Sequence, residues 1–153
     1  MTDEKYHHVG ERFQWLAEME SLAEGGWQEL YILVRSTLQR LNQEAGADLL
    51  EVRPPEYEGG DWTVAFRTRN ILQFRVSTGG TEQAAGAIAT CLVEKLPPSL
   101  MADLPIATFY YIKTDDRCEW GRVVKDRTER SDEPILDVIA EYVDTVLRAY
   151  PRR

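Results

Sequence analysis

The sequence predicts an α+β fold with a mainly antiparallel sheet and helices packed on one of its faces. Closely spaced runs of alternating apolar and polar residues occupy the middle of the chain, which is typical of half-buried strands. The segments at both ends instead repeat apolar residues every three or four positions, as amphipathic helices do. Hairpin-linked strands flanked by helices favour the α+β class.

Two helices are expected in the N-terminal third. The first covers residues 9–23, and the second begins at Trp27 and continues its apolar stripe to Leu41. Gly25-Gly26 is predicted to separate them, because two glycines inside a helix cost about 2 kcal/mol relative to alanines. Residues 1–8 are polar and are expected to be mobile.

Five strands are expected, at residues 49–52, 61–68, 71–76, 108–113 and 117–125. In the second of them, Trp62, Val64 and Phe66 share one face and polar residues alternate with them. Only Arg69-Asn70 separates the second strand from the third, which predicts a tight hairpin. Residues 54–60 are predicted to be a loop and residues 125–133 a charged, solvated segment.

Two further helices complete the predicted fold. The alanine-rich segment from Thr81 to Leu96 is expected to be helical and to end at Pro97-Pro98. Asp132-Glu133-Pro134 opens a last helix, which carries an unbroken apolar stripe from Ile135 to Tyr150. The predicted order is α-α-β-β-β-α-β-β-α in a single domain that spans residues 1–153.

Composition restricts the function. The chain has 153 residues and a formal net charge of -8 at pH 7, which disfavours a nucleic-acid partner because the phosphate backbone repels a negative surface. The polar start lacks a signal core, and no apolar run approaches the roughly 18 residues of a membrane span. We therefore expect a cytoplasmic protein with no membrane partner.

Cys91 and Cys118 are expected to be free, buried thiols.

The residues needed for common catalytic and cofactor sites are missing. His7 and His8 are the two histidines, and adjacent helical side chains point about 100° apart, which is poor for holding one metal ion. With no other histidine, a Ser-His-Asp or Cys-His arrangement lacks its base. The glycines near Gly80 do not match a dinucleotide or phosphate loop. We expect no metal, no cofactor and no enzymatic activity.

One catalytic alternative stays open. Asp61 on one predicted strand and Gln73-Phe74-Arg75 on the next resemble the PD-(D/E)xK nuclease pattern, with Glu29 offered by the preceding helix. That resemblance implies metal-dependent cleavage of nucleic acid. Arg75 stands where the family has lysine, and arginine is a poor substitute for that role.

The first hairpin also offers a candidate binding surface. Its polar face contains Arg67, Arg69, Gln73 and Arg75, which together form a small cationic patch suited to an acidic partner segment.

The element order from the Trp27 helix to the C-terminal helix, residues 27–150, resembles the type III secretion chaperones, which are small and acidic. The resemblance implies a homodimer that holds an extended segment of a partner protein against its sheet without catalysis. The sequence therefore predicts a non-enzymatic protein-binding domain. The alternatives are the nuclease and an acidic inhibitor or immunity protein that masks a basic toxin.

Overall fold

The computed structural model describes residues 3–54, 61–96, 107–124, 127–130 and 132–150. Its elements follow the order α1 (Asp3–Ala45), β1 (Leu50–Arg53), β2 (Trp62–Phe66), β3 (Arg69–Thr78), the short 3-10 helix η1 (Glu82–Ala84), β4 (Ala89–Lys95), β5 (Ala107–Thr114), β6 (Arg117–Val124), β7 (Arg127–Arg130) and α2 (Asp132–Arg148). The predicted loop at residues 54–60 lies, apart from Pro54, outside the described residues.

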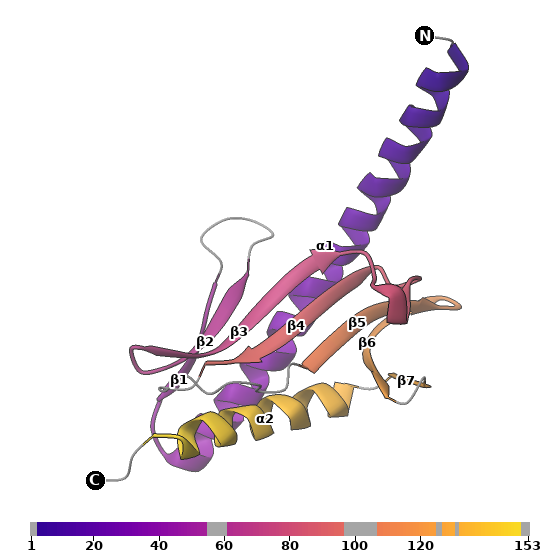
Figure 1. Cartoon of the computed structure of the whole chain (residues 1–153). Coiled ribbons are helices and arrows are strands. Elements are labelled where there is room, and N and C mark those ends of the chain that lie inside the picture. Colours follow the sequence, from indigo (N-terminus) through magenta and orange to yellow (C-terminus); the bar gives the residue numbers. More distant parts are fainter. Residues whose placement is uncertain (1–2, 55–60, 97–106, 125–126, 131, 151–153) are drawn as a thin grey trace.

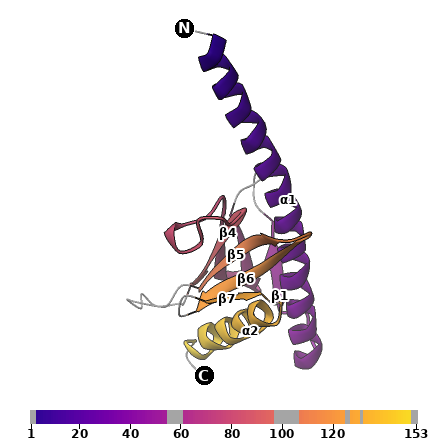
Figure 2. The same cartoon turned by 90° about the vertical axis from the view of Figure 1, so that its right-hand side faces the viewer.

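The strands form one twisted sheet in which each strand pairs with its neighbours along the chain. Among the described residues the sheet has 7 strands in the order β1 to β7, and each pairing is antiparallel. Both helices pack on one face of this sheet (Figures 1 and 2). The predicted α+β class, the antiparallel sheet and the one-sided helices are confirmed, whereas the predicted five strands are too few.

The face that the helices cover is built from rows of apolar side chains that run across the strands. One row joins Trp62, Phe74 and Val93, which are register partners on β2, β3 and β4. The Trp62 and Phe74 rings stack with their centroids 4.0 Å apart. This contact shows why alternation in these strands was a reliable signal: each alternate residue enters the same core.

Helix α1 is continuous, so the predicted break at Gly25-Gly26 is wrong. Gly26 is buried and lies directly against Tyr111, where an added Cβ would sit 2.7 Å from the ring. The Trp120 indole nitrogen donates a buried hydrogen bond of 2.8 Å to the Gly26 carbonyl. The absence of a side chain at residue 26 therefore allows α1 to pack closely on the sheet. The contacts with Tyr111 and Trp120 offset the poor helix propensity of glycine.

The segment from Thr81 to Leu96 is also not the expected helix. It contains η1 and then β4, a strand that pairs with β3 on one side and β5 on the other. Residues 87–91 are all buried, and Ala89, Cys91 and Val93 of β4 belong to the core. Of the alanines in this segment, Ala84 ends η1 and Ala89 begins β4.

Two smaller corrections concern the hairpin turn and the charged C-terminal stretch. The β2–β3 turn lies at Arg67-Thr68 rather than Arg69-Asn70, because a bulge leaves Ile71 as an extra residue in β3 opposite Val64 and Ala65. Within the predicted solvated segment 125–133, the residues Arg127–Arg130 form β7 and pair with β6.

The two adjacent glycines of α1 provide a matched pair of substitutions. Gly26→Ala is expected to lower the free energy of unfolding by about 1–3 kcal/mol, because the new methyl group overlaps the Tyr111 ring. Gly25→Ala meets open space and is expected to raise it by about 1 kcal/mol through helix propensity. Urea denaturation followed by circular dichroism measures both. If both substitutions shift the free energy of unfolding in the same direction, the contact between Gly26 and Tyr111 does not set the cost of a side chain at residue 26.

Candidate functional site

The four residues predicted to form a cationic patch lie in three separate places. Arg69 places its guanidinium 5.3 Å from the centre of the Tyr150 ring, at the end of α2. Gln73 and Arg75 lie on the face of β3 away from the helices, where Arg75 forms an ion pair of 3.1 Å with Glu94 on β4. Arg67 lies in the exposed hairpin turn. The structure therefore does not bring these four side chains into one binding surface.

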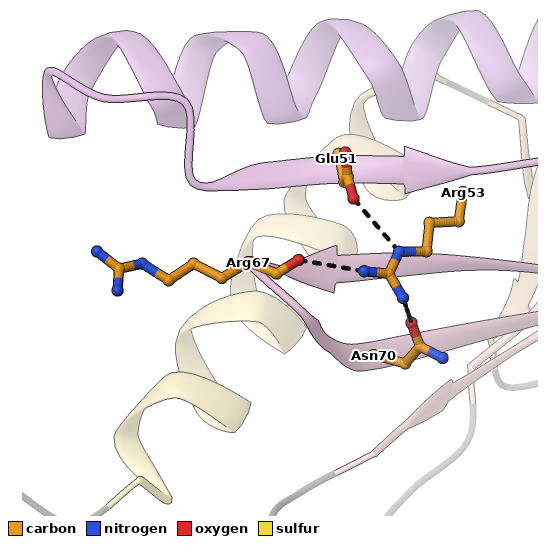
Figure 3. Close-up of polar contacts among 4 residues, drawn as sticks. All are labelled: Glu51, Arg53, Arg67 and Asn70. Atoms are coloured by element: carbon orange, nitrogen blue, oxygen red, sulfur yellow. Dashed lines mark hydrogen bonds and ion pairs between the residues drawn. The ribbon is translucent and has the colours of Figure 1, made fainter.

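Arg53, which the sequence pattern did not single out, is the cation that organises this hairpin. Its guanidinium donates to the Asn70 side chain at 3.1 Å and to the Arg67 carbonyl at 3.2 Å (Figure 3). Its Nε pairs with Glu51 at 3.3 Å. Arg67 has a positive φ of 56°, a backbone conformation that is unfavourable for a side-chain-bearing residue. The Arg53 contact holds that turn against β1, and the Arg67 side chain points away from it.

The residues of the nuclease alternative are used for backbone and strand contacts. One Asp61 carboxylate oxygen accepts a hydrogen bond of 3.1 Å from the Val76 backbone nitrogen. Gln73 lies between Thr63 and Glu94 in the sheet register. In the described parts of the chain, histidine, cysteine, aspartate and glutamate side chains form no group of three or more that could hold a metal ion.

A groove lies between α1 and the edge strand β1. This edge groove has a volume of about 340 Å³. It is lined by Tyr31, Arg35, Leu38, Gln39, Asn42, Leu50, Glu51 and Val52. β1 has β2 on one side and α1 along the other (Figure 3), and the groove lies between β1 and α1.

Asn42 closes one end of the edge groove. Its side-chain oxygen accepts from the backbone nitrogens of Leu49 at 3.0 Å and Leu50 at 2.9 Å, and its amide nitrogen donates to the Leu50 carbonyl at 2.9 Å. The amide thus binds the edge of β1 as a neighbouring strand would. The residue is buried, and nothing in its local sequence predicts this role.

Asn42→Ala is expected to lower the free energy of unfolding by about 1–3 kcal/mol, because backbone groups of Leu49 and Leu50 lose their buried partners. Gln43→Ala, at the adjacent exposed position, is expected to change stability by less than about 0.5 kcal/mol. Thermal and urea unfolding provide the measurement. An Asn42→Ala variant as stable as Gln43→Ala would contradict this role for the amide.

The two cysteines differ in accessibility. Both are free, and Cys91 is fully buried whereas Cys118 is half-buried. Burial raises the pKa of the Cys91 thiol well above its ordinary value, and the nearby negative charge of Asp61 adds to the rise. A neutral, buried thiol is a poor nucleophile, so Cys91 behaves as a core residue.

In the folded protein we expect a thiol-reactive dye to modify Cys118 well before Cys91. Absorbance of the released chromophore follows the reaction, and denaturant should make both thiols react at similar rates. A Cys118→Ala variant should then lose the fast phase. A fast phase that persists in that variant would show that Cys91 is accessible.

The N-terminal part of α1 extends away from the rest of the molecule, as both views show (Figures 1 and 2). Within this projecting segment, residues 3–22, no residue is buried, and the first buried residue of the helix is Ala23. Several large apolar side chains are nevertheless exposed there: Tyr6, Val9, Phe13, Trp15, Leu16 and Leu22. Such a concentration of exposed apolar surface is unusual for a monomer and is typical of an interaction site.

Comparisons of this chain with protein-family models, with curated proteins and with solved structures find no match. Across the described residues, no helix is both long enough and apolar enough to cross a membrane.

Proposed function

We propose that this chain is a non-enzymatic protein-binding domain that acts as a homodimer and holds an extended segment of a partner protein. The edge groove is the observation that carries this proposal. An extended segment that adds to a sheet edge gains main-chain hydrogen bonds, while its alternate side chains enter pockets beside the strand.

The backbone of β1 suits such an addition. Leu50 directs both its nitrogen and its carbonyl toward Asn42, at the outer edge of the strand. Because alternate residues of a strand direct their polar groups to the same edge, Val52 presents its nitrogen and carbonyl there too. A partner segment can therefore continue at Val52 the pairing that Asn42 makes at Leu50.

The groove walls suit a segment of mixed character. Tyr31, Leu38 and Val52 offer apolar surface, and Arg35 and Glu51 offer charges of opposite sign. Its volume of about 340 Å³ is at the small end of ligand sites, which span about 300–1,000 Å³. That size fits a few side chains of an extended segment.

The likeness to secretion chaperones remains a prediction. It was based on an element order in which a helix follows the third strand, and this chain has β4 after β3 and η1. Neither the nuclease nor the acidic inhibitor is favoured by a specific contact among the described residues. The proposal that β1 binds a partner segment does not depend on a resemblance to secretion chaperones, nucleases or acidic inhibitors.

Val52→Pro tests strand addition. Proline removes the outward N–H but is compatible with an edge strand, so the fold should persist while segment binding is lost. Peptides selected from a displayed library of unstructured segments would be measured by calorimetry against the wild type, Val52→Pro and the control Val52→Thr, which keeps the N–H. Of the three proteins, Val52→Pro should be the one that fails to bind the selected peptides. Equal affinity for all three proteins, or selection of no peptide, would refute the proposed function.

A further inference from the structure

The projecting segment carries an apolar stripe with a regular spacing. Tyr6, Val9, Phe13 and Leu16 alternate intervals of three and four residues, and Phe13 is the most exposed of them at 69%. The same spacing continues through Ala23, Trp27, Leu30 and Val34, which pack against the sheet. We call the first four residues the exposed stripe. It is the uncovered continuation of a helix face that elsewhere forms the core.

We propose that the exposed stripe binds the same stripe of a second copy of this chain, with the two helices antiparallel. This inference rests on the homodimer of the proposed function and assigns its interface. Apolar residues at alternating intervals of three and four are the pattern by which two helices pack side by side.

The spacing of the exposed stripe is self-complementary. Antiparallel packing about residue 11 sets Tyr6 opposite Leu16 of the second copy and Val9 opposite Phe13. Each layer then combines an aromatic residue with a smaller aliphatic one, so the layers have similar volumes. The pairing also gives the projecting segment a source of stability, because most helical stability in proteins comes from packing of an apolar face.

Three of the acidic residues lie away from the exposed stripe. Glu4, Glu11 and Glu18 recur every seven residues, and at 3.6 residues per turn they lie on the side of the helix opposite the exposed stripe. Gly10 and Ala17 flank the stripe on one side and allow close approach of the second helix.

The sheet determines the direction of pairing. From Ala23 onward the stripe faces the chain's own sheet, so a parallel partner would direct its body into that sheet. A parallel pair would also set Glu20 against Glu20, at a position in line with the stripe. In the antiparallel pair, Glu20 lies beyond Asp3 of the second copy, outside the paired length.

The paired length of the two helices is about 25 Å, so we expect a weak dimer that dissociates on dilution.

Analytical ultracentrifugation over a range of concentrations tests the interface. The wild type should show reversible dimerisation, and Phe13→Glu should weaken it at least about 30-fold. Gln14→Glu adds the same charge at the adjacent position, which points away from the stripe, and should have little effect. Val9→Glu provides a second disruption. Circular dichroism and thermal unfolding of each variant establish that the body remains folded.

Spin labels on a cysteine at Ser21, in a chain that also carries Cys118→Ala, distinguish the two directions. Antiparallel pairing separates the two labelled positions by about 30 Å along the helices, whereas parallel pairing brings them side by side. A wild type that stays monomeric at every concentration overturns the proposal. A dimer that tolerates Phe13→Glu and Val9→Glu, or labels side by side, also overturns it. Segment binding at Val52 is measured separately, so loss of the dimer with retained peptide binding leaves the edge groove intact.

Discussion

The close approach of α1 to the sheet at Gly26 is the constraint on which the other features depend. The Gly26 carbonyl accepts from the buried Trp120 indole, and the Tyr111 ring fills the space that a side chain at residue 26 would need. Trp27 and Tyr111 both pack on Trp120, with ring centroids 5.0 and 5.1 Å apart. Burial raises the pKa of Tyr111 to about 12, with the Glu29 carboxylate and Cys118 adding to the rise, so this phenol stays neutral at physiological pH. Residue 26 is thus where α1 is anchored to β5 and β6.

That anchor positions both candidate interaction surfaces. On its C-terminal side, α1 continues past Leu30 and Val34 to Asn42, whose amide binds the β1 edge and closes the groove. On its N-terminal side, the helix leaves the sheet just before Ala23 and projects. Two cation–aromatic contacts attach α2 to the same body: Lys95 lies 4.2 Å from the Tyr142 ring centre, and Arg69 reaches Tyr150. The groove and the projecting segment therefore lie on opposite sides of one anchor point along a single continuous helix.

The fold class and several elements could be predicted because their signals are local. The C-terminal helix and the β2–β3 hairpin follow periodicities that a single core face imposes. The wrong predictions occur where a residue distant in the sequence determines the local structure. Glycine at residue 26 is favourable only because Tyr111 occupies the adjacent space, and Ala89 belongs to a strand only because β3 and β5 pair with it on both sides. Neither contact can be inferred from the secondary-structure propensity of the local sequence.

The candidate site was less predictable for the same reason. The alternation of faces in a hairpin predicts that Arg67 and Arg75 share a patch, but the bulge near Ile71 and the ion pair of Arg75 with Glu94 separate them. Arg53 and Asn42 act through backbone groups that are distant in sequence, so no residue pattern marks them. The stripe of α1 has the same spacing in its exposed and its buried halves, and the sequence alone cannot tell which half the sheet covers.

The two proposals together determine how a partner could be held. In an antiparallel pair centred on residue 11, the Arg35 side chains of the two edge grooves lie about 70 Å apart along the helices. An extended chain spans at most about 3.3–3.6 Å per residue, so a single partner would need roughly 20 residues between two binding segments to occupy both grooves. Shorter partners must bind each groove independently. Dimerisation then increases affinity only for partners with two well-separated segments, since a linker that cannot span the sites contributes no effective concentration. This geometry raises the affinity for long, unstructured partners and leaves the affinity for short peptides unchanged.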